Sequence, residues 1–191
     1  MIVPMQELPK DIFRKDAVEI AQFLLGKVIS CNDCSAMIVE TEAYKTDPAS
    51  HAFKITKRSE IMLKTYGVWY IYFIYGMYNC INITTNGKNN AGAVLIRALE
   101  PLEGIEPMKQ RRKTDDIHNL CSGPGKLTQA LGINRTLNAT PINDKIKLYQ
   151  YKSIPTEQIA ASPRIGIKEA KDLLWRFYIK ENKFVSWIIS K

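Results

Sequence analysis

The chain has 191 residues, of which 46% are hydrophobic and 24% are charged. This length supports one hydrophobic core and is short for two, so we expect a single domain with the composition of an ordinary globular protein. The formal net charge of +8 favours a polyanionic partner, although an excess of lysine is also common on plain solvated surfaces. The apolar stretches fall short of the length that spans a bilayer, which argues against a membrane protein. We therefore expect an intracellular, soluble protein with no membrane partner.

The N-terminal part of the chain predicts a helix followed by two strands. Asp16 can cap a helix whose apolar residues lie on one side, and Gly26 ends that helix. Strands are expected at 27–31 and 36–44. The polar segment 45–66 that follows is predicted to be irregular, with room for one helical turn.

Two of the four cysteines, Cys31 and Cys34, flank an Asn-Asp pair that is typical of a tight turn between strands. A zinc site with four cysteine ligands would need a second close pair, but Cys80 and Cys121 are isolated in the sequence. We therefore interpret the cysteines as reduced and structural rather than as a metal or redox site.

The segment WYIYFIYGMYNCIN, which starts at Trp69, contains six aromatic residues in fourteen. Strand alternation places Trp69, Ile71 and Phe73 on one face, which we expect to enter the core. Tyr70 and Tyr72 lie on the other face, where flat rings can stack on a nucleobase. A packed core strand is the simpler explanation of such a segment, so its function depends on the rest of the chain.

The remainder of the chain adds strands and helices without a Pro/Gly-rich linker. We predict strands at 79–85, 91–101 and 145–151, and helices at 102–113, 124–131 and 168–174. Consecutive strands with short connections favour an antiparallel sheet with helices packed around it. The expected fold class is α+β in one compact domain.

An acidic strand and an arginine in an apolar run are the first candidates for chemistry. On a strand, Glu40, Glu42 and Tyr44 of VETEAY share one face. A buried glutamate there could act as a general base, whereas the simpler alternative is an edge strand with solvated charges. Arg97, in VLIRALE, needs an anionic partner if it is buried. A partner such as Glu42 would give an ion pair that either is purely structural or holds a water or a phosphate.

A loop histidine and two basic features complete the candidates. His51 is one of two histidines, which gives little support to a histidine metal site, but beside aromatic rings it could contact a base. Lys126 follows the glycines of SGPGK at a predicted helix start, which suits a phosphate of a nucleic-acid backbone. The basic run 109–113 is more often a solvated helix end than a binding surface.

Several longer motifs together resemble a known family, the alkyladenine (3-methyladenine) DNA glycosylases. The chain contains, in the order and at the separations of that family, IVETEAY, IYGMYNCIN, VLIRALEPLEG, LCSGPGKLTQALGI, PRIGI and WRFY. The resemblance runs from residue 8 to the C-terminus, so it implies one glycosylase domain over 1–191. It implies a curved antiparallel sheet surrounded by helices, without a helix-hairpin-helix module.

The resemblance also implies an activity. Family members are monofunctional base-excision enzymes that flip alkylated or deaminated purines out of double-stranded DNA and hydrolyse the N-glycosidic bond. The implied lesions are of the 3-methyladenine type, with hypoxanthine and ethenoadenine as further candidates. The family resemblance makes Glu42 the general base that activates the water, and Arg97 and the backbone carbonyl of Ile165 the groups that hold this water. The implied enzyme is a monomer that needs no cofactor or metal.

The same resemblance assigns a pocket for the flipped base. Tyr44 and Tyr72 match the aromatic residues that sandwich the base, and His51 matches the histidine that completes the pocket. Asn82 matches the asparagine that disfavours the exocyclic amino group of normal guanine.

A last group of residues is implied to contact the DNA around the lesion. Tyr75 matches the side chain that enters the gap left by the flipped nucleotide, with Met77 and Tyr78 beside it. Arg58 and Lys126 are further expected DNA contacts.

The chain departs from the family pattern at Ser59, Leu63 and Asn79, where asparagine, phenylalanine and an aromatic residue are usual. Two rival functions stay open. One is a lesion-binding protein that has lost catalysis, which the presence of Glu42 and Arg97 disfavours. The other is a bifunctional glycosylase and lyase, which requires an amine nucleophile that the pocket motifs do not supply.

Overall fold

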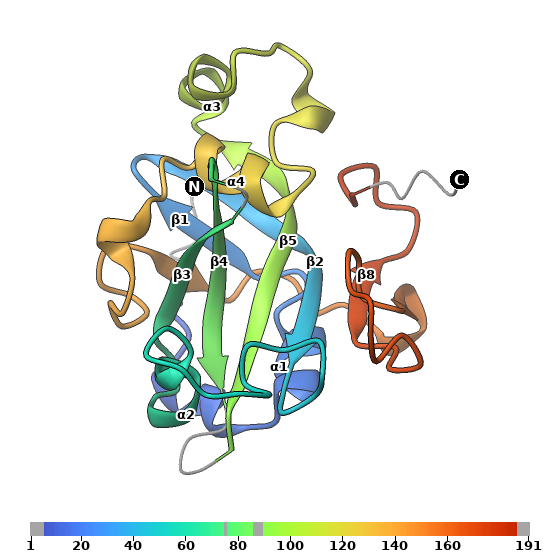
Figure 1. Cartoon of the computed structure of the whole chain (residues 1–191). Coiled ribbons are helices and arrows are strands. Elements are labelled where there is room, and N and C mark those ends of the chain that lie inside the picture. Colours follow the sequence, from blue (N-terminus) through green and yellow to red (C-terminus); the bar gives the residue numbers. More distant parts are fainter. Residues whose placement is uncertain (1–5, 75, 86–89, 187–191) are drawn as a thin grey trace.

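One curled antiparallel sheet organises the chain, as Figure 1 shows. The computed structural model describes residues 6–74, 76–85 and 90–186. In these residues the main path of the sheet runs β3-β4-β5-β2-β1-β6, β8 pairs with β2, and β7 pairs with β8. The strands are β1 (Val28–Cys31), β2 (Cys34–Tyr44), β3 (Trp69–Ile74), β4 (Tyr78–Thr85), β5 (Gly92–Glu103), β6 (Lys147–Tyr149), β7 (Ile159–Ser162) and β8 (Arg176–Ile179). The α-helices are α1 (Ala17–Phe23), α2 (Glu60–Lys64), α3 (Ile105–Arg112) and α4 (Pro124–Ala130).

Strand β2 lies inside the sheet and is paired on both sides. One edge pairs with β5 from Ser35 to Tyr44. The other edge pairs first with β1 and then, at residues 40–42, with β8. The acidic motif VETEAY therefore lies on an interior strand, which excludes the alternative of a solvated edge strand.

Helix α1 packs against β2 and β5 and covers one face of the sheet. The side chain of Asp16 accepts a hydrogen bond of 2.9 Å from the backbone N–H of Val18, which is the predicted N-cap. Ile20 and Ala21 are fully buried. The hydroxyl of Thr41 donates to the carbonyl of Ala21 at 2.8 Å, so this strand residue points toward the helix. Because strand side chains alternate, the neighbouring Glu42 points to the opposite face.

The hairpin between β1 and β2 forms as predicted. Asn32 and Asp33 have φ angles of 49° and 60°, which suit the type I′ turn that an Asn-Asp pair accommodates. Cys31 and Cys34 face each other across the turn as free, buried thiols. The two isolated cysteines, Cys80 and Cys121, are also free and buried.

Strand β3 agrees with the predicted alternation except at its end. Trp69 and Ile71 are buried in the core, and the indole N–H of Trp69 donates to the carbonyl of Ile146 at 3.2 Å. Phe73 is 41% exposed, so its predicted core position is wrong. The β3–β4 hairpin extends beyond the layer of side chains that covers the sheet, so alternation no longer implies burial there.

The C-terminal part differs most from the sequence-based prediction. Residues 168–174 are not helical, because Ala170 adopts a left-handed φ of 53° that an α-helix does not accommodate. Strand β7, which was not predicted, pairs with β8 in this part. Helix α3 begins at Ile105 rather than at 102, because β5 continues to Glu103.

The predicted fold class is confirmed: the described residues form one compact α+β domain with a curled antiparallel sheet and surrounding helices, without a helix-hairpin-helix module. No helix within the described ranges is both long and apolar enough to cross a membrane.

Candidate active site

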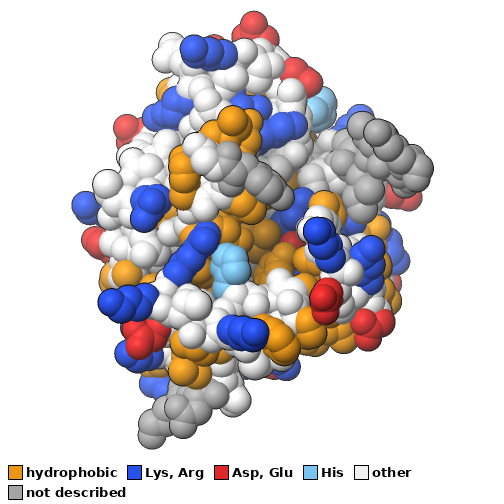
Figure 2. All heavy atoms as spheres, in the orientation of Figure 1, with side chains coloured by type: hydrophobic (Ala, Val, Ile, Leu, Met, Phe, Trp, Pro, Cys, Tyr) orange, Lys and Arg blue, Asp and Glu red, His pale blue; other side chains and the backbone are white. Residues whose placement is uncertain are grey.

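A cavity of about 480 Å³ opens on the sheet face opposite α1. Its floor is formed by β3, β4 and β5, and its walls by Tyr44, by residues 49–51, by residues 165–167 and by the start of α4. Figure 2 shows hydrophobic side chains gathered in this hollow, with a histidine and Lys or Arg side chains around its rim. The volume and the mixed lining are those of a small-molecule site that fits a group of nucleobase size.

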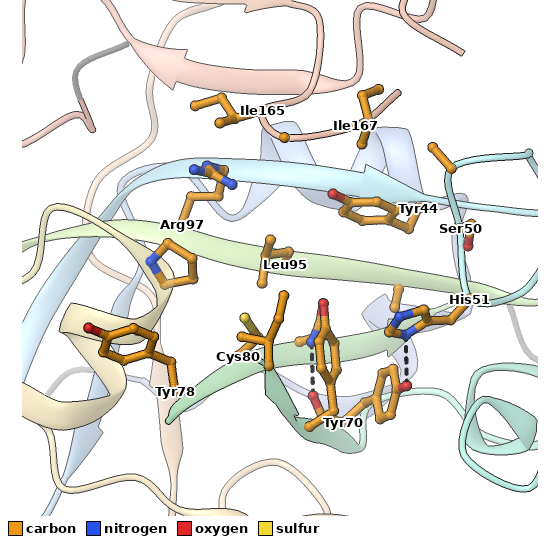
Figure 3. A pocket seen from close by; sticks show the side chains of 18 of the residues that line it. Tyr44, Ser50, His51, Tyr70, Tyr78, Cys80, Leu95, Arg97, Ile165 and Ile167 are labelled. Carbon is orange, nitrogen blue, oxygen red and sulfur yellow. Dashed lines mark hydrogen bonds between the residues drawn. The ribbon is translucent and has the colours of Figure 1, made fainter. Parts of the chain in front are cut away.

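Aromatic rings from two strands and one loop meet in the cavity, as Figure 3 shows. Tyr70 and Tyr72 point into it from β3, with their ring centroids 5.2 Å apart. The ring of His51 lies 4.8 Å from that of Tyr72, and Nδ1 of His51 is 3.0 Å from the hydroxyl of Tyr70. Tyr44 lies on the wall formed by β2. The predicted aromatic residues therefore lie together, and burial raises the pKa values of Tyr44 and Tyr72, so both phenols stay neutral.

Glu42 lies fully buried behind the wall formed by Tyr44, Arg97 and Ile165. Its Oε1 accepts a hydrogen bond of 2.6 Å from the backbone N–H of Ile165. Its Oε2 accepts from the hydroxyl of Tyr44 at 2.8 Å and from Nη1 of Arg97 at 3.4 Å. These donors stabilise a carboxylate that water does not solvate. The structure thus uses the N–H of Ile165, a contact that the sequence analysis did not predict.

Arg97 bridges two buried carboxylates. Its Nε is 3.3 Å from Oε1 of Glu40, and its Nη1 is 3.4 Å from Oε2 of Glu42. Although burial works in the opposite direction, these two carboxylates raise the pKa of Arg97. The predicted anionic partner of Arg97 is therefore present, and Glu40 is a second one.

Asn82 lies on the cavity floor and is 3% exposed. On β4 it pairs with Tyr70 of β3, and its Nδ2 donates to the carbonyl of Tyr70 at 3.0 Å. This bond fixes the amide, with Nδ2 directed toward the neighbouring strand. The structure thus places Asn82 with the aromatic residues, as predicted.

The residues predicted to contact DNA lie around the cavity mouth and on α4. Met77 is 64% exposed, and Tyr78 is partly exposed and also lines the cavity. The guanidinium of Arg58 lies 4.7 Å from the ring of Tyr72 and donates to the carbonyl of Phe73 at 3.1 Å.

Lys126 does not line the cavity, because its ammonium is engaged within α4 and the segment before it. It donates to the side chain of Asn119 and, at 3.3 Å, to the hydroxyl of Ser122. Tyr75 lies outside the described residues.

A buried ion pair supports Tyr44 from outside the cavity. Arg164, 3% exposed, lies 4.7 Å from the Tyr44 ring and pairs with Asp47 at 2.6 Å. Sequence reasoning missed this pair and the part played by Tyr70. Strand alternation already placed Tyr70 beside Tyr72, whereas nothing in the sequence connects Arg164 to Asp47.

The environment of His51 gives a prediction for its titration. Burial lowers the pKa of His51 below the ordinary value of 6.5, and the charge of Arg58 lowers it further. The imidazole of His51 therefore binds a proton less readily in the folded protein than in the unfolded chain. As a result, the neutral ring stabilises the folded state above pH 6.5, and this stabilisation is lost as the pH falls. An NMR titration should place the midpoint of His51 below 6.5, and Arg58→Met should raise it. A midpoint at or above 6.5 in the wild type would contradict this environment.

Among the described residues, no group of three or more His, Cys, Asp or Glu side chains is arranged to hold a metal ion. The cavity instead combines stacked tyrosines, a histidine and a buried acid beside an arginine. This combination defines a site for a flat, uncharged or cationic ring next to a possible general base. Enzymes that act on a base flipped out of DNA combine such a pocket with a positively charged protein surface.

Comparison with known proteins identifies the family. The family model described as Methylpurine-DNA glycosylase (MPG) matches residues 11–183. Three relatives named "Putative 3-methyladenine DNA glycosylase" are similar over nearly the whole chain. The protein of Prosthecochloris aestuarii is 44% identical and aligns over 95% of this chain and 92% of its own length. That of Methanoculleus marisnigri is 42% identical over 94% and 98%, and that of Clostridium perfringens is 43% identical over 94% and 98%. The chain belongs to the methylpurine-DNA glycosylase family, a family of DNA-repair hydrolases that act on N-glycosyl bonds.

Proposed function

We propose that this protein is a monofunctional DNA glycosylase of base-excision repair. It flips alkylated or deaminated purines, 3-methyladenine among them, out of duplex DNA and hydrolyses the N-glycosidic bond with a water that Glu42 activates. The observation that carries the proposal is the fully buried Glu42 carboxylate, stabilised by three hydrogen-bond donors directly behind an aromatic cavity. Family membership supports the class of reaction.

Base flipping accounts for the shape of the cavity. A purine inside a duplex is unreachable, and extruding it costs a few kcal/mol, least when the base is damaged or mispaired. Tyr44 and Tyr72 would stack on the extruded base from opposite sides, with His51 at the third side. Asn82 on the floor would disfavour the exocyclic amino group of guanine. Cationic purines gain additional attraction from the electron-rich faces of tyrosine.

For an alkylated purine, the chemistry requires a base more than an acid, whereas departing hypoxanthine also takes up a proton from solvent. Alkylation places positive charge on the purine and weakens the glycosidic bond, so the leaving group departs readily and the proposal includes no cofactor. Glu42 would take a proton from the water that attacks the anomeric carbon of the sugar. Arg97 and the backbone carbonyl of Ile165 are proposed to hold this water, since both residues line the cavity in front of Glu42.

The surroundings of the cavity fit a duplex. The net charge of +8 supplies salt-dependent affinity for the DNA backbone, and Arg58 and Lys126 are proposed contacts. Met77 and Tyr78 would pack against the minor groove, where an apolar wedge offsets the cost of unstacking. Tyr75 is proposed to be the wedge that enters the gap left by the flipped nucleotide. We propose that the whole chain acts as one domain and as a monomer.

An oligonucleotide assay tests the proposal. Duplexes with hypoxanthine, ethenoadenine or an alkylated purine are incubated with the protein, and strand breakage is measured with and without hot alkali. Breakage that appears after alkali treatment alone supports the monofunctional enzyme. Breakage without alkali would instead identify a lyase, and tight binding without abasic sites on any duplex would identify a lesion-binding protein.

A further inference from the structure

Glu40 is a second buried carboxylate of the acidic strand, and the proposed function gives it no task. It is fully buried, and its Oε1 lies 2.6 Å from Nε of Arg176 and 3.3 Å from Nε of Arg97. Ser186 donates to it twice, from the backbone N–H at 2.7 Å and from the hydroxyl at 2.9 Å. These donors satisfy the hydrogen-bonding capacity of the buried carboxyl group.

The backbone of β2 is irregular where Glu40 lies. The register with β5 shifts on both sides of this residue, between Ile38 and Glu40 and again between Glu40 and Thr41. Such bulges re-aim a side chain and recur next to active sites. Here Glu40 and Glu42 both reach the guanidinium of Arg97, although they contact different nitrogens.

Charge is balanced within this group. Glu40 and Glu42 carry two negative charges, and Arg97 and Arg176 carry two positive charges. Arg176 also lies over the ring of Tyr178, with Cζ 4.6 Å from its centroid. In a buried network of this kind, loss of one charge leaves its partners uncompensated.

The groups that face Glu42 come from four directions. Arg97 faces it from β5 and Tyr44 from β2. Cys80 approaches it from β4, and Ile165 donates a backbone N–H from the segment before β8. Glu40 acts on Glu42 through Arg97, which both carboxylates share.

We infer that Glu40 is a positioning residue for base hydrolysis: it holds Nε of Arg97, which directs Nη1 of the same guanidinium to Glu42. Because Glu40 also binds Arg176 and Ser186, it connects the catalytic pair to β8 and to the segment that follows it. This inference rests on the proposed function.

The test uses single-turnover release of hypoxanthine from a duplex over a range of pH. Glu40→Gln should lower the maximal rate about 100-fold, the scale on which a misplaced catalytic group is felt. The midpoint on the acid side of the pH–rate profile should also fall, because Glu40→Gln removes a negative charge from the buried group around Arg97. Glu40→Asp keeps the charge, so its rate should fall while its midpoint stays at the wild-type pH.

A purely structural role for Glu40 gives a different result. In that case Glu40→Gln unfolds at lower denaturant concentration but keeps the wild-type pH profile, which overturns the inference. If Glu40→Gln does not fold, Ser186→Ala carries the test. It removes one of the donors that fix Glu40, so Arg97 is held less firmly and the maximal rate should fall while the protein stays folded. A Ser186→Ala variant with the wild-type rate would overturn the inference.

Glu100→Gln serves as the matched control. Glu100 lies on β5 and accepts a hydrogen bond of 2.8 Å from Asn182, which glutamine can also accept, and it contacts neither Arg97 nor Arg176 among the bonds described. Its rate and midpoint should equal those of the wild type. A wild type that releases no base overturns both the proposed function and the inference. An active wild type with an unchanged Glu40→Gln overturns the inference alone.

Discussion

Glu42→Gln should lower the single-turnover rate of base release by about 1,000-fold, within the range that general acid–base catalysis contributes. The amide has nearly the same shape as the carboxylate: its oxygen can accept from the N–H of Ile165, and its NH2 can donate to the hydroxyl oxygen of Tyr44. It cannot take a proton from water. The loss should therefore fall on the chemical step and leave the aromatic cavity intact.

Two measurements separate this explanation from a disrupted site. The affinity for a duplex with a lesion should stay within about threefold of the wild type, because Glu42 lies behind the cavity wall and does not line it. The unfolding midpoint should fall, because Arg97 loses one of its two carboxylate partners, but a cooperative unfolding transition should show that the variant is folded. A fully active Glu42→Gln variant would show that the general base is another residue.

Arg97→Leu should be the most destabilising of the substitutions considered, with a loss of about 3–5 kcal/mol in the free energy of unfolding. It removes the guanidinium that bridges Glu40 and Glu42, both of which are fully buried. Leucine fills part of the space but leaves negative charge without its partner. Since single domains are stable by only about 5–15 kcal/mol, the variant should be close to unfolding under ordinary conditions.

Chemical denaturation checks this prediction. Arg14→Leu is the control, since Arg14 forms an exposed pair with Asp11 and its removal should change the midpoint little. An Arg97→Leu variant as stable as Arg14→Leu would contradict the buried network.

The sequence predicted those features that depend on neighbours along the chain. The cap at Asp16 and the Asn-Asp turn are local choices, and both form as expected. Alternation along β3 correctly separated Trp69 from Tyr72. Alternation wrongly predicted that Phe73 is buried, because burial there depends on where the β3–β4 hairpin extends out of the domain.

The remaining features depend on parts of the chain that are far apart in sequence. The predicted helix at 168–174 is absent because Ala170 takes a left-handed conformation, although the segment is largely exposed. Arg164 meets Asp47 across more than a hundred residues, and only the folded sheet brings them together. Glu40 was visible as a charge on the same strand as Glu42, but its two arginine partners come from β5 and β8.

The central proposal for this protein is that a water activated by Glu42 hydrolyses the glycosidic bond of a flipped purine. The most direct measurement is mass spectrometry of the free base released from a hypoxanthine duplex under single-turnover conditions. The wild type should release one hypoxanthine for each duplex bound and leave both strands intact until alkali is added, whereas Glu42→Gln should bind the duplex and release almost none. A wild type that binds the duplex without releasing base, or that releases base no faster than Glu42→Gln, would contradict this proposal.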